Sequence, residues 1–244
     1  ADMDKSRMHS IRNHIAKAME KLETEDFQLE ELHIAGEKCA ALRVPQIVIT
    51  AAGEIDQKER IADALLTARA GQDIVYAGWA GLEGMLRIIG EKEAELRERF
   101  TPAFIGQMKA YDSELCGLSK IAVADAMGVS VIRQVSRGGI LASLWDLAKD
   151  TELGLNLDLK KIAVRQETIE VCEHFRLNPY QLASGGSFLM LTENGEALAD
   201  ALNQKGIQAA VIGQLTDSND KIIHNGEDMR YIDRPAPDEL MKVF

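Results

Sequence analysis

Hydrophobic residues in the C-terminal three quarters of the chain follow two alternating patterns, one typical of strands and one typical of helices. Short apolar, β-branched runs predict strands at residues 73–77, 129–132, 153–159, 187–191 and 209–212. Apolar residues three and four apart predict helices between them, at residues 82–99, 102–111, 119–127, 140–148, 168–175 and 195–205. Strands that alternate with helices indicate an α/β (α+β) domain in which helices pack on a sheet.

Two features indicate that the sheet is mixed. Asn225-Gly226 is a strong hairpin signal, and it separates strand-like runs at residues 221–224 and 229–232. Residues 153–159 alternate leucine with polar residues, which is typical of a half-buried strand. Neither feature suits an all-parallel sheet, so we expect a mixed sheet flanked by helices.

The N-terminal quarter has its own patterns. Residues 7–24 are predicted to form an amphipathic helix. Its apolar face consists of Ile11, Ile15, Met19 and Leu22. Residues 44–51 predict a strand that ends at Gly53, and the charged, alanine-rich residues 57–70 predict a helix or a linker.

Composition narrows the function classes. The 244 residues suffice for one large or two small domains, and the net charge of −11 disfavours nonspecific binding to nucleic acid or anionic membranes. No run approaches the ~20 apolar residues of a membrane span, and the N-terminus lacks a signal-like apolar segment. Cys39, Cys116 and Cys172 are too widely spaced for a zinc site or a disulfide framework. We therefore expect a cytoplasmic protein that binds neither membrane nor nucleic acid.

The segment at residues 131–141 is a strand, a paired-glycine turn and a helix in immediate succession. Such a turn can present free helix N–H groups to an anion, here those of residues 137–140 around Gly138 and Gly139. Arg133 and Arg137 would add positive charge, and Ser136 a hydroxyl. The alternative is a tight turn that needs glycine only for packing.

A second glycine segment is Ser184-Gly185-Gly186-Ser187, just before the strand at 187–191. It is either a second part of the same ligand site or an ordinary glycine turn. Glu83 follows Trp79 in a third glycine-containing segment, residues 78–84. At the start of a predicted helix, Glu83 is better explained as a carboxylate that stabilises the helix N-terminus than as a catalytic base.

In order, the segments at residues 71–84, 131–141, 162–168 and 178–187 resemble the C-terminal domain of the aminoimidazole ribonucleotide (AIR) synthetase superfamily. The most similar branch is that of the hydrogenase-maturation carbamoyl dehydratases. The resemblance implies an α/β/α sandwich around a mixed sheet at residues 57–244. It also implies that residues 1–56 are a remnant of the family's N-terminal nucleotide-binding domain. By the same resemblance the two glycine segments lie near nucleotide phosphates or substrate.

The chain departs from this pattern where the family reads His-Asp-Ala/Val-Thr-Glu-Gly-Gly. Arg133 replaces the histidine, Gln134 the aspartate and Arg137 the glutamate, while Gly138 and Gly139 are kept. An amide and two cations cannot ligate Mg²⁺ as carboxylates do, so we expect no metal site and no catalytic residue here. The terminal cysteine of the dehydratases has no counterpart in the last residues given, Lys242-Val243-Phe244, so we do not expect the dehydratase reaction as an autonomous activity.

Two functional interpretations follow. The first is a degenerate family member that binds a phosphate-bearing ligand or a partner protein without hydrolysing ATP on its own. The second is an ATP-dependent enzyme whose nucleotide-binding half is a separate chain or has been removed. ATP or phosphate is implied as a ligand by the resemblance alone. The expected partner is a second copy of the chain, in a homodimer, or a separate ATPase-like chain.

Overall fold

The computed structural model describes residues 9, 13, 17, 65–129 and 131–244. The chain divides into two units, Ala1–Glu54 and Ile55–Phe244, and the description below concerns the second. In the first unit His9, Asn13 and Lys17 are helical and exposed. The rest of the expected helix at 7–24, the expected strand at 44–51 and Cys39 lie outside the described residues. The assignment of residues 1–56 to a domain remnant stays a prediction.

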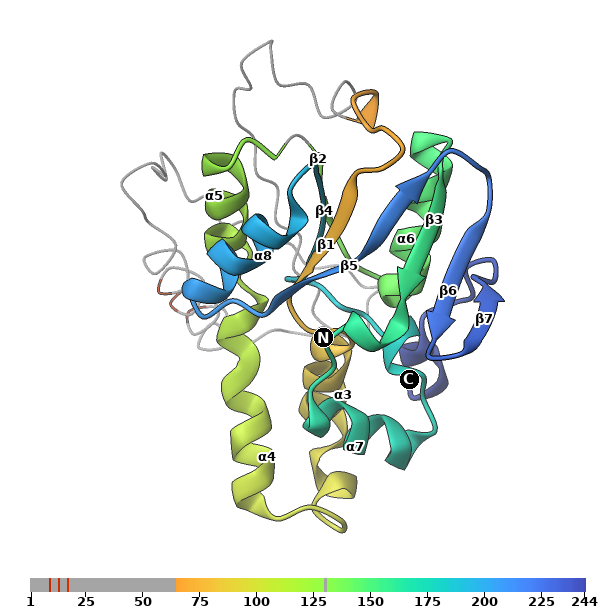
Figure 1. Cartoon of the computed structure of the whole chain (residues 1–244). Coiled ribbons are helices and arrows are strands. Elements are labelled where there is room, and N and C mark those ends of the chain that lie inside the picture. Colours follow the sequence, from red (N-terminus) through yellow and green to blue (C-terminus); the bar gives the residue numbers. More distant parts are fainter. Residues whose placement is uncertain (1–8, 10–12, 14–16, 18–64, 130) are drawn as a thin grey trace. The chain divides into compact units, whose positions relative to one another are not determined.

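The described residues form a seven-stranded sheet with the order β2-β4-β1-β5-β3-β6-β7 (Figure 1). Neighbouring strands are antiparallel except β3 and β6, which are parallel. The mixed sheet predicted from the sequence is therefore confirmed. The strands are β1 (Asp73–Ala77), β2 (Val131–Gln134), β3 (Gly154–Asp158), β4 (Phe188–Thr192), β5 (Ala209–Thr216), β6 (Lys221–Asn225) and β7 (Asp228–Tyr231).

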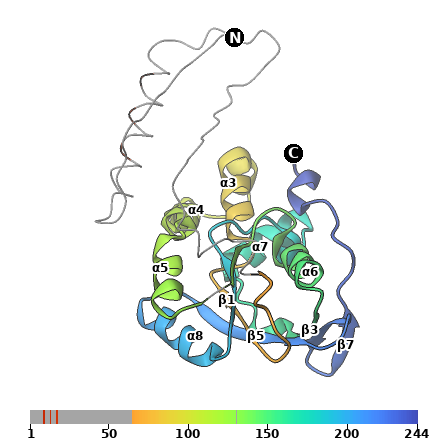
Figure 2. The same cartoon turned by 90° about the horizontal axis from the view of Figure 1, so that it is seen from above.

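Helices cover both faces of the sheet. Alternate side chains of β1 point to opposite faces and contribute to a separate core on each. Ile74 and Tyr76 pack in one core with α6 (Gly139–Thr151). Val75 and Ala77 pack in another core with α5 (Leu118–Ala126) and α8 (Gly195–Gln204). Figure 2 shows α6 on one side of the strands and α5 and α8 on the other. The expected α/β/α sandwich is confirmed.

A third core lies among helices beyond one end of the sheet. It consists of apolar side chains from α3 (Leu82–Leu96), α4 (Pro102–Lys109) and α7 (Gln166–Phe175). Leu240 of the short C-terminal helix η4 (Glu239–Lys242) joins it. Three further 3₁₀ turns connect the elements: η1 (Ala110–Leu115), η2 (Leu159–Lys161) and η3 (Pro179–Gln181). In the described part of the chain, no helix is both long and apolar enough to cross a membrane.

Strand β5 continues past the end predicted for it. The sequence predicts this strand only to residue 212, yet β5 extends through Gly213 to Thr216. A Cβ atom on Gly213 would lie 2.1 Å from the carbonyl oxygen of Asn156 on β3. Gly213 therefore does not end the strand, and its missing side chain lets β3 approach β5 closely.

Candidate functional site

Three loops meet at one edge of the sheet, and together they form what we call the glycine-loop cluster (residues 78–84, 135–139 and 182–187). Strand β4 lies between β1 and β2 and is antiparallel to both. The C-terminal ends of β1 and β2 and the start of β4 must therefore lie at the same end of the strands. The loops that follow β1 and β2 and the loop that precedes β4 are thus brought together from distant parts of the sequence.

Ser184 joins the three loops. Its side chain is fully buried, and its hydroxyl accepts a hydrogen bond from the Gly81 N–H at 2.7 Å and donates to the Leu182 carbonyl at 2.7 Å. Its own N–H donates to the Ser136 carbonyl at 3.3 Å. The hydroxyl of Ser187, also buried, donates to the Ser184 carbonyl at 2.6 Å. Ser184 therefore holds the three loops together, whereas the Ser187 hydroxyl stabilises the loop at residues 182–187 itself.

Several glycines of the cluster are needed for close packing. A Cβ atom on Gly139 would lie 2.4 Å from the Tyr180 carbonyl oxygen, and one on Gly186 would lie 2.4 Å from the Leu115 carbonyl oxygen. Both glycines also have positive φ angles, 66° and 83°. Other residues would be strained and would clash with backbone at these positions. These observations favour the packing role, which the sequence analysis kept as the alternative to ligand binding.

The N–H group of Gly138 is occupied by a carboxylate of the same chain. It donates to Oδ2 of Asp238 at 2.7 Å, while Oδ1 of Asp238 accepts from the Leu240 N–H at 2.9 Å. Asp238 thus caps η4 and also lies at the N-terminus of α6, where a negative charge is stabilised. Sequence reasoning assigned this anion position to a phosphate and did not consider Asp238. The only available signal was the Pro-Asp pair before a short helix.

The two arginines near the turn have different surroundings. Nη1 of Arg133 lies 2.6 Å from Oδ2 of Asp150, and Nη2 lies 4.0 Å from Oδ2 of Asp146. Both carboxylates belong to α6, so the charge of Arg133 is balanced along that helix. Arg137 is exposed and makes no ion pair with the residues that the structure describes. Of the two predicted cationic residues, Arg137 alone remains available to an external anion.

Glu83 links two loops of the cluster. Its Oε2 atom accepts from the Gly185 N–H at 2.9 Å, and its Oε1 atom lies 3.7 Å from Nη1 of Arg87. It lies in the first turn of α3, as the sequence analysis expected. A Cβ atom on Gly185 would lie only 2.7 Å from Oε2 of Glu83, so the glycine allows this contact. Glu83 is engaged in structural contacts on both oxygens.

An arginine held between two aromatic rings lies beside the cluster, and sequence reasoning did not foresee this contact. The guanidinium carbon of Arg165 lies 4.3 Å from the ring centre of Trp79 and 3.9 Å from that of Tyr111. The same guanidinium pairs with Glu114. Such stacking is a favourable cation–π arrangement. The residues come from separate segments of the sequence, so no local motif could have indicated the contact.

Burial shifts two ionisable groups near the cluster. The Tyr76 hydroxyl lies close to Ser187 but has no hydrogen-bond partner in the described part of the chain, and burial raises its pKa well above the usual value. Burial also raises the pKa of the Cys172 thiol on α7 to about 12. Among the described residues, no group of three His, Cys, Asp or Glu side chains could hold a metal ion. The absence of a metal site from the whole chain stays a prediction.

Comparisons with known proteins agree with this fold. The chain is 22% identical over 236 residues to a putative hydrogenase expression/formation protein of Methanocaldococcus jannaschii, which covers 94% of the chain and 68% of that relative. It is 26% identical over 160 residues to the carbamoyl dehydratase HypE of Azotobacter vinelandii, which covers 64% of the chain and 45% of the relative. The chain therefore spans less than half the length of that dehydratase.

The crystal structure of Escherichia coli HypE has a similar fold, with a TM-score of 0.58 and 21% sequence identity. The similarity covers 74% of this chain and 54% of that one. Residues 69–225, which include all three loops of the glycine-loop cluster, match the AIR synthase related protein C-terminal domain. The chain therefore belongs to the family of AIR synthase related proteins.

Proposed function

We propose that this chain is a hydrogenase-maturation-type member of its family that does not hydrolyse ATP by itself and acts by binding a partner. The main support for the proposal is the hydrogen bond from the Gly138 N–H to Asp238. Through this bond a carboxylate of the chain itself occupies the position where the turn could bind an anion. A nucleotide phosphate at this N–H would first have to displace Asp238.

The charges around the turn support the same proposal. Magnesium-dependent phosphate chemistry needs carboxylate or other hard oxygen ligands. Glu83 is bound to Gly185 and Arg87 through its two oxygens. At the positions of the family's acidic residues the chain has Gln134 and Arg137. These loops therefore offer no free carboxylate to a Mg²⁺ ion that would accompany a nucleotide.

The partner that we propose is either a second copy of this chain or a separate chain that presents an ATPase-like domain. One structural neighbour, with a TM-score of 0.53 and 22% identity, was solved as a HypE–HypF complex. That complex supports a role in which this fold docks on another maturation protein. A cytoplasmic location and a homodimer belong to the same proposal.

Titration of the full chain with ATP and Mg²⁺ in a calorimeter tests the first part of the proposal. We expect no magnesium-dependent binding at micromolar ATP and no release of phosphate in a parallel assay. Escherichia coli HypE serves as the positive control under the same conditions. Micromolar, magnesium-dependent binding to this chain would contradict the proposal.

The second candidate function is an ATP-dependent enzyme that is completed by a separate nucleotide-binding half. The observation in its favour is that the chain covers only 45% of the Azotobacter dehydratase. Mixing the full chain with a separately produced N-terminal domain of a HypE relative tests it. ATP hydrolysis by the mixture, with none by either component, would favour this enzyme over the non-hydrolysing protein.

A further inference from the structure

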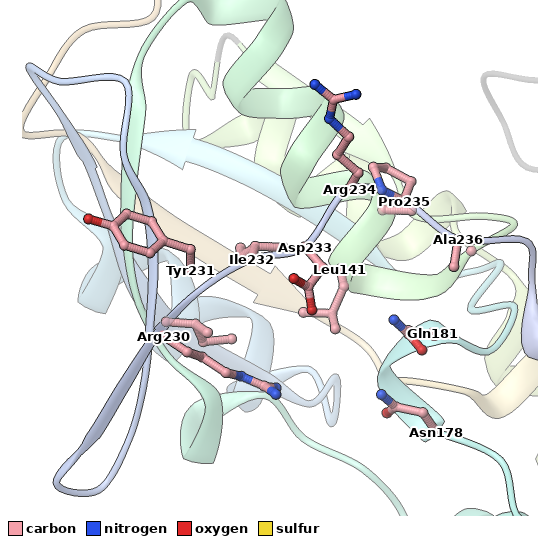
Figure 3. A pocket seen from close by; sticks show the side chains of 13 residues that line it. Leu141, Asn178, Gln181, Arg230, Tyr231, Ile232, Asp233, Arg234, Pro235 and Ala236 are labelled. Atoms are coloured by element: carbon pink, nitrogen blue, oxygen red, sulfur yellow. The ribbon is translucent and has the colours of Figure 1, made fainter.

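A small cavity lies between the start of α6, η3 and the segment that follows β7 (Figure 3). Its volume is about 130 Å³. A single water needs roughly 10–15 Å³ by this measure, so the cavity admits a molecule of on the order of ten non-hydrogen atoms. Gly138 is the one residue of the glycine-loop cluster that lines it. The cavity is therefore a separate feature that borders the cluster.

One part of the cavity wall is apolar. Leu141 and Ala142 come from α6, Ile223 comes from β6, and Ile232 follows β7. Ile223 and Ile232 are almost fully buried. This wall can cover a short aliphatic group and remove its surface from water.

The remaining wall presents opposite charges that are not paired with each other. In Figure 3 the guanidinium of Arg230 and the carboxylate of Asp233 both point toward the central space, whereas Tyr231 and Arg234 point away. Within the described residues, neither Arg230 nor Asp233 forms an ion pair. One cation and one anion thus face the same small space.

Two amide side chains complete the polar wall from the side of η3. Asn178 and Gln181 face the cavity across from the charged pair. The Oδ1 atom of Asn178 accepts from the Tyr180 N–H at 3.0 Å, so its amide hydrogens remain as donors. The Gln181 side chain makes no hydrogen bond within the part of the chain that the structure describes. Both amides can donate to the same oxygens that Arg230 would bind.

We propose that this cavity binds a small zwitterion, namely an aliphatic α-amino acid. Its carboxylate would pair with Arg230 and accept from the amides of Asn178 and Gln181, while its ammonium group would pair with Asp233. Its side chain would lie on Leu141 and Ile232. A ligand with one charge would leave either Arg230 or Asp233 without a partner, so the cavity selects for both charges together.

A matched ligand series tests the proposal on the full chain. L-Leucine, isocaproate and isoamylamine have similar aliphatic groups. L-Leucine carries both charges, isocaproate carries only the negative charge, and isoamylamine carries only the positive charge. We expect L-leucine to bind at least about tenfold more tightly than either analogue, because each lost charge-assisted hydrogen bond lowers affinity by about that factor. Calorimetry gives the affinities, and backbone amide shifts at Gly138 and Gln181 locate the site.

Two variants separate the contributions of the two charges. Arg230→Gln should reduce the advantage of L-leucine over isoamylamine, because only the amides of Asn178 and Gln181 remain to bind the carboxylate. Asp233→Asn should remove its advantage over isocaproate. Both side chains are exposed, so the variants are expected to fold, and thermal unfolding verifies this. Arg69→Gln, an exposed arginine outside the cavity, is the control and should keep full selectivity.

The proposal is overturned if neither L-leucine nor L-valine binds at millimolar concentration. It is also overturned if both variants retain the selectivity of the parent. The ligand series contains no nucleotide, so its result is independent of the proposed lack of ATP hydrolysis. Either proposal can fail while the other stands.

Discussion

Oδ2 of Asp238 accepts a hydrogen bond from the Gly138 N–H at 2.7 Å, which joins residues 100 positions apart in the sequence. The contact connects the N-terminus of α6 with the C-terminal helix η4. It therefore couples the occupancy of the glycine turn to the position of the last residues of the chain. A ligand that takes the Gly138 N–H must compete with this carboxylate.

Replacement of Asp238 tests that competition. Asp238→Ala removes two acceptors, so we expect it to lower the free energy of unfolding by about 1–2 kcal/mol. The same variant frees the Gly138 N–H and should bind inorganic phosphate more tightly than the parent does. Asp217→Ala, an exposed aspartate elsewhere, should change neither property. Unfolding in urea and phosphate titration measure the two effects. Unchanged stability in Asp238→Ala would contradict the structural role of the contact.

Arg137 and Arg133 should differ in their effect on anion binding. Arg137 is exposed and makes no ion pair with described residues, whereas Arg133 is held by Asp150. If the turn binds an oxyanion, Arg137→Ala should weaken the binding by about 1–3 kcal/mol. Arg133→Ala should change it by less than about 1 kcal/mol. The measurement is titration with phosphate and ATP, and equal losses in both variants would refute the distinction.

Gly139 and Gly128 form a matched pair for the packing role of glycine. Both have positive φ angles, but a Cβ atom would meet the Tyr180 oxygen at 2.4 Å from Gly139 and nothing within 4 Å from Gly128. Gly128→Ala should cost about 1–2 kcal/mol of stability through backbone strain. Gly139→Ala should cost at least about 1–3 kcal/mol more, because backbone atoms must also move. Similar losses of stability for the two variants in chemical denaturation would show that the clash with the Tyr180 oxygen adds no further destabilisation.

The Tyr76 hydroxyl is buried without a hydrogen-bond partner in the described part of the chain. An unsatisfied buried hydroxyl costs about 1–3 kcal/mol, so Tyr76→Phe should leave stability unchanged or raise it by about 1 kcal/mol. Leu189→Ala, in the same core, should instead destabilise by about 2–5 kcal/mol. A clear loss of stability in Tyr76→Phe would reveal a hydrogen bond to that hydroxyl.

Alkaline unfolding should contain a component from Cys172. Burial raises the pKa of its thiol from 9.0 to about 12. Above pH 9 the unfolded state releases this proton while the folded state keeps it, so stability falls as the pH rises from 9 toward 12. The difference in unfolding free energy between the parent and Cys172→Ala should therefore shrink across that range. A difference that does not change with pH would show that the thiol is not protected by the fold.

The elements of the sheet could be predicted from the sequence because their signals are local. The hairpin of β6 and β7 forms where it was predicted, although Asn225 ends β6 and the turn itself is Gly226-Glu227. The runs at β1 and β4 are short, apolar and bounded by turn residues. These signals depend on neighbours within a few positions. The paired-glycine turn before α6 was found for the same reason.

The contacts that decide the chemistry of the site could not be predicted, because they join distant segments. Asp238 contacts Gly138 across 100 residues of sequence. Arg165 lies between Trp79 and Tyr111 only in the folded chain. The strand predicted at residues 209–212 is too short, because β5 continues through Gly213 to Thr216. At Gly213 the strand closely approaches β3, which no local pattern shows.

The position of β1 in the middle of the sheet has a consequence for synthesis on the ribosome. This strand appears early in the domain, but its two neighbours, β4 and β5, are made much later. Asp73, at the start of β1, bonds Gln214 on β5, 141 residues further along. Contacts of such long range slow folding, and they leave the apolar strand at Ile74–Ala77 without partners while the chain grows. We therefore expect the nascent chain to be most prone to aggregation before β5 has emerged.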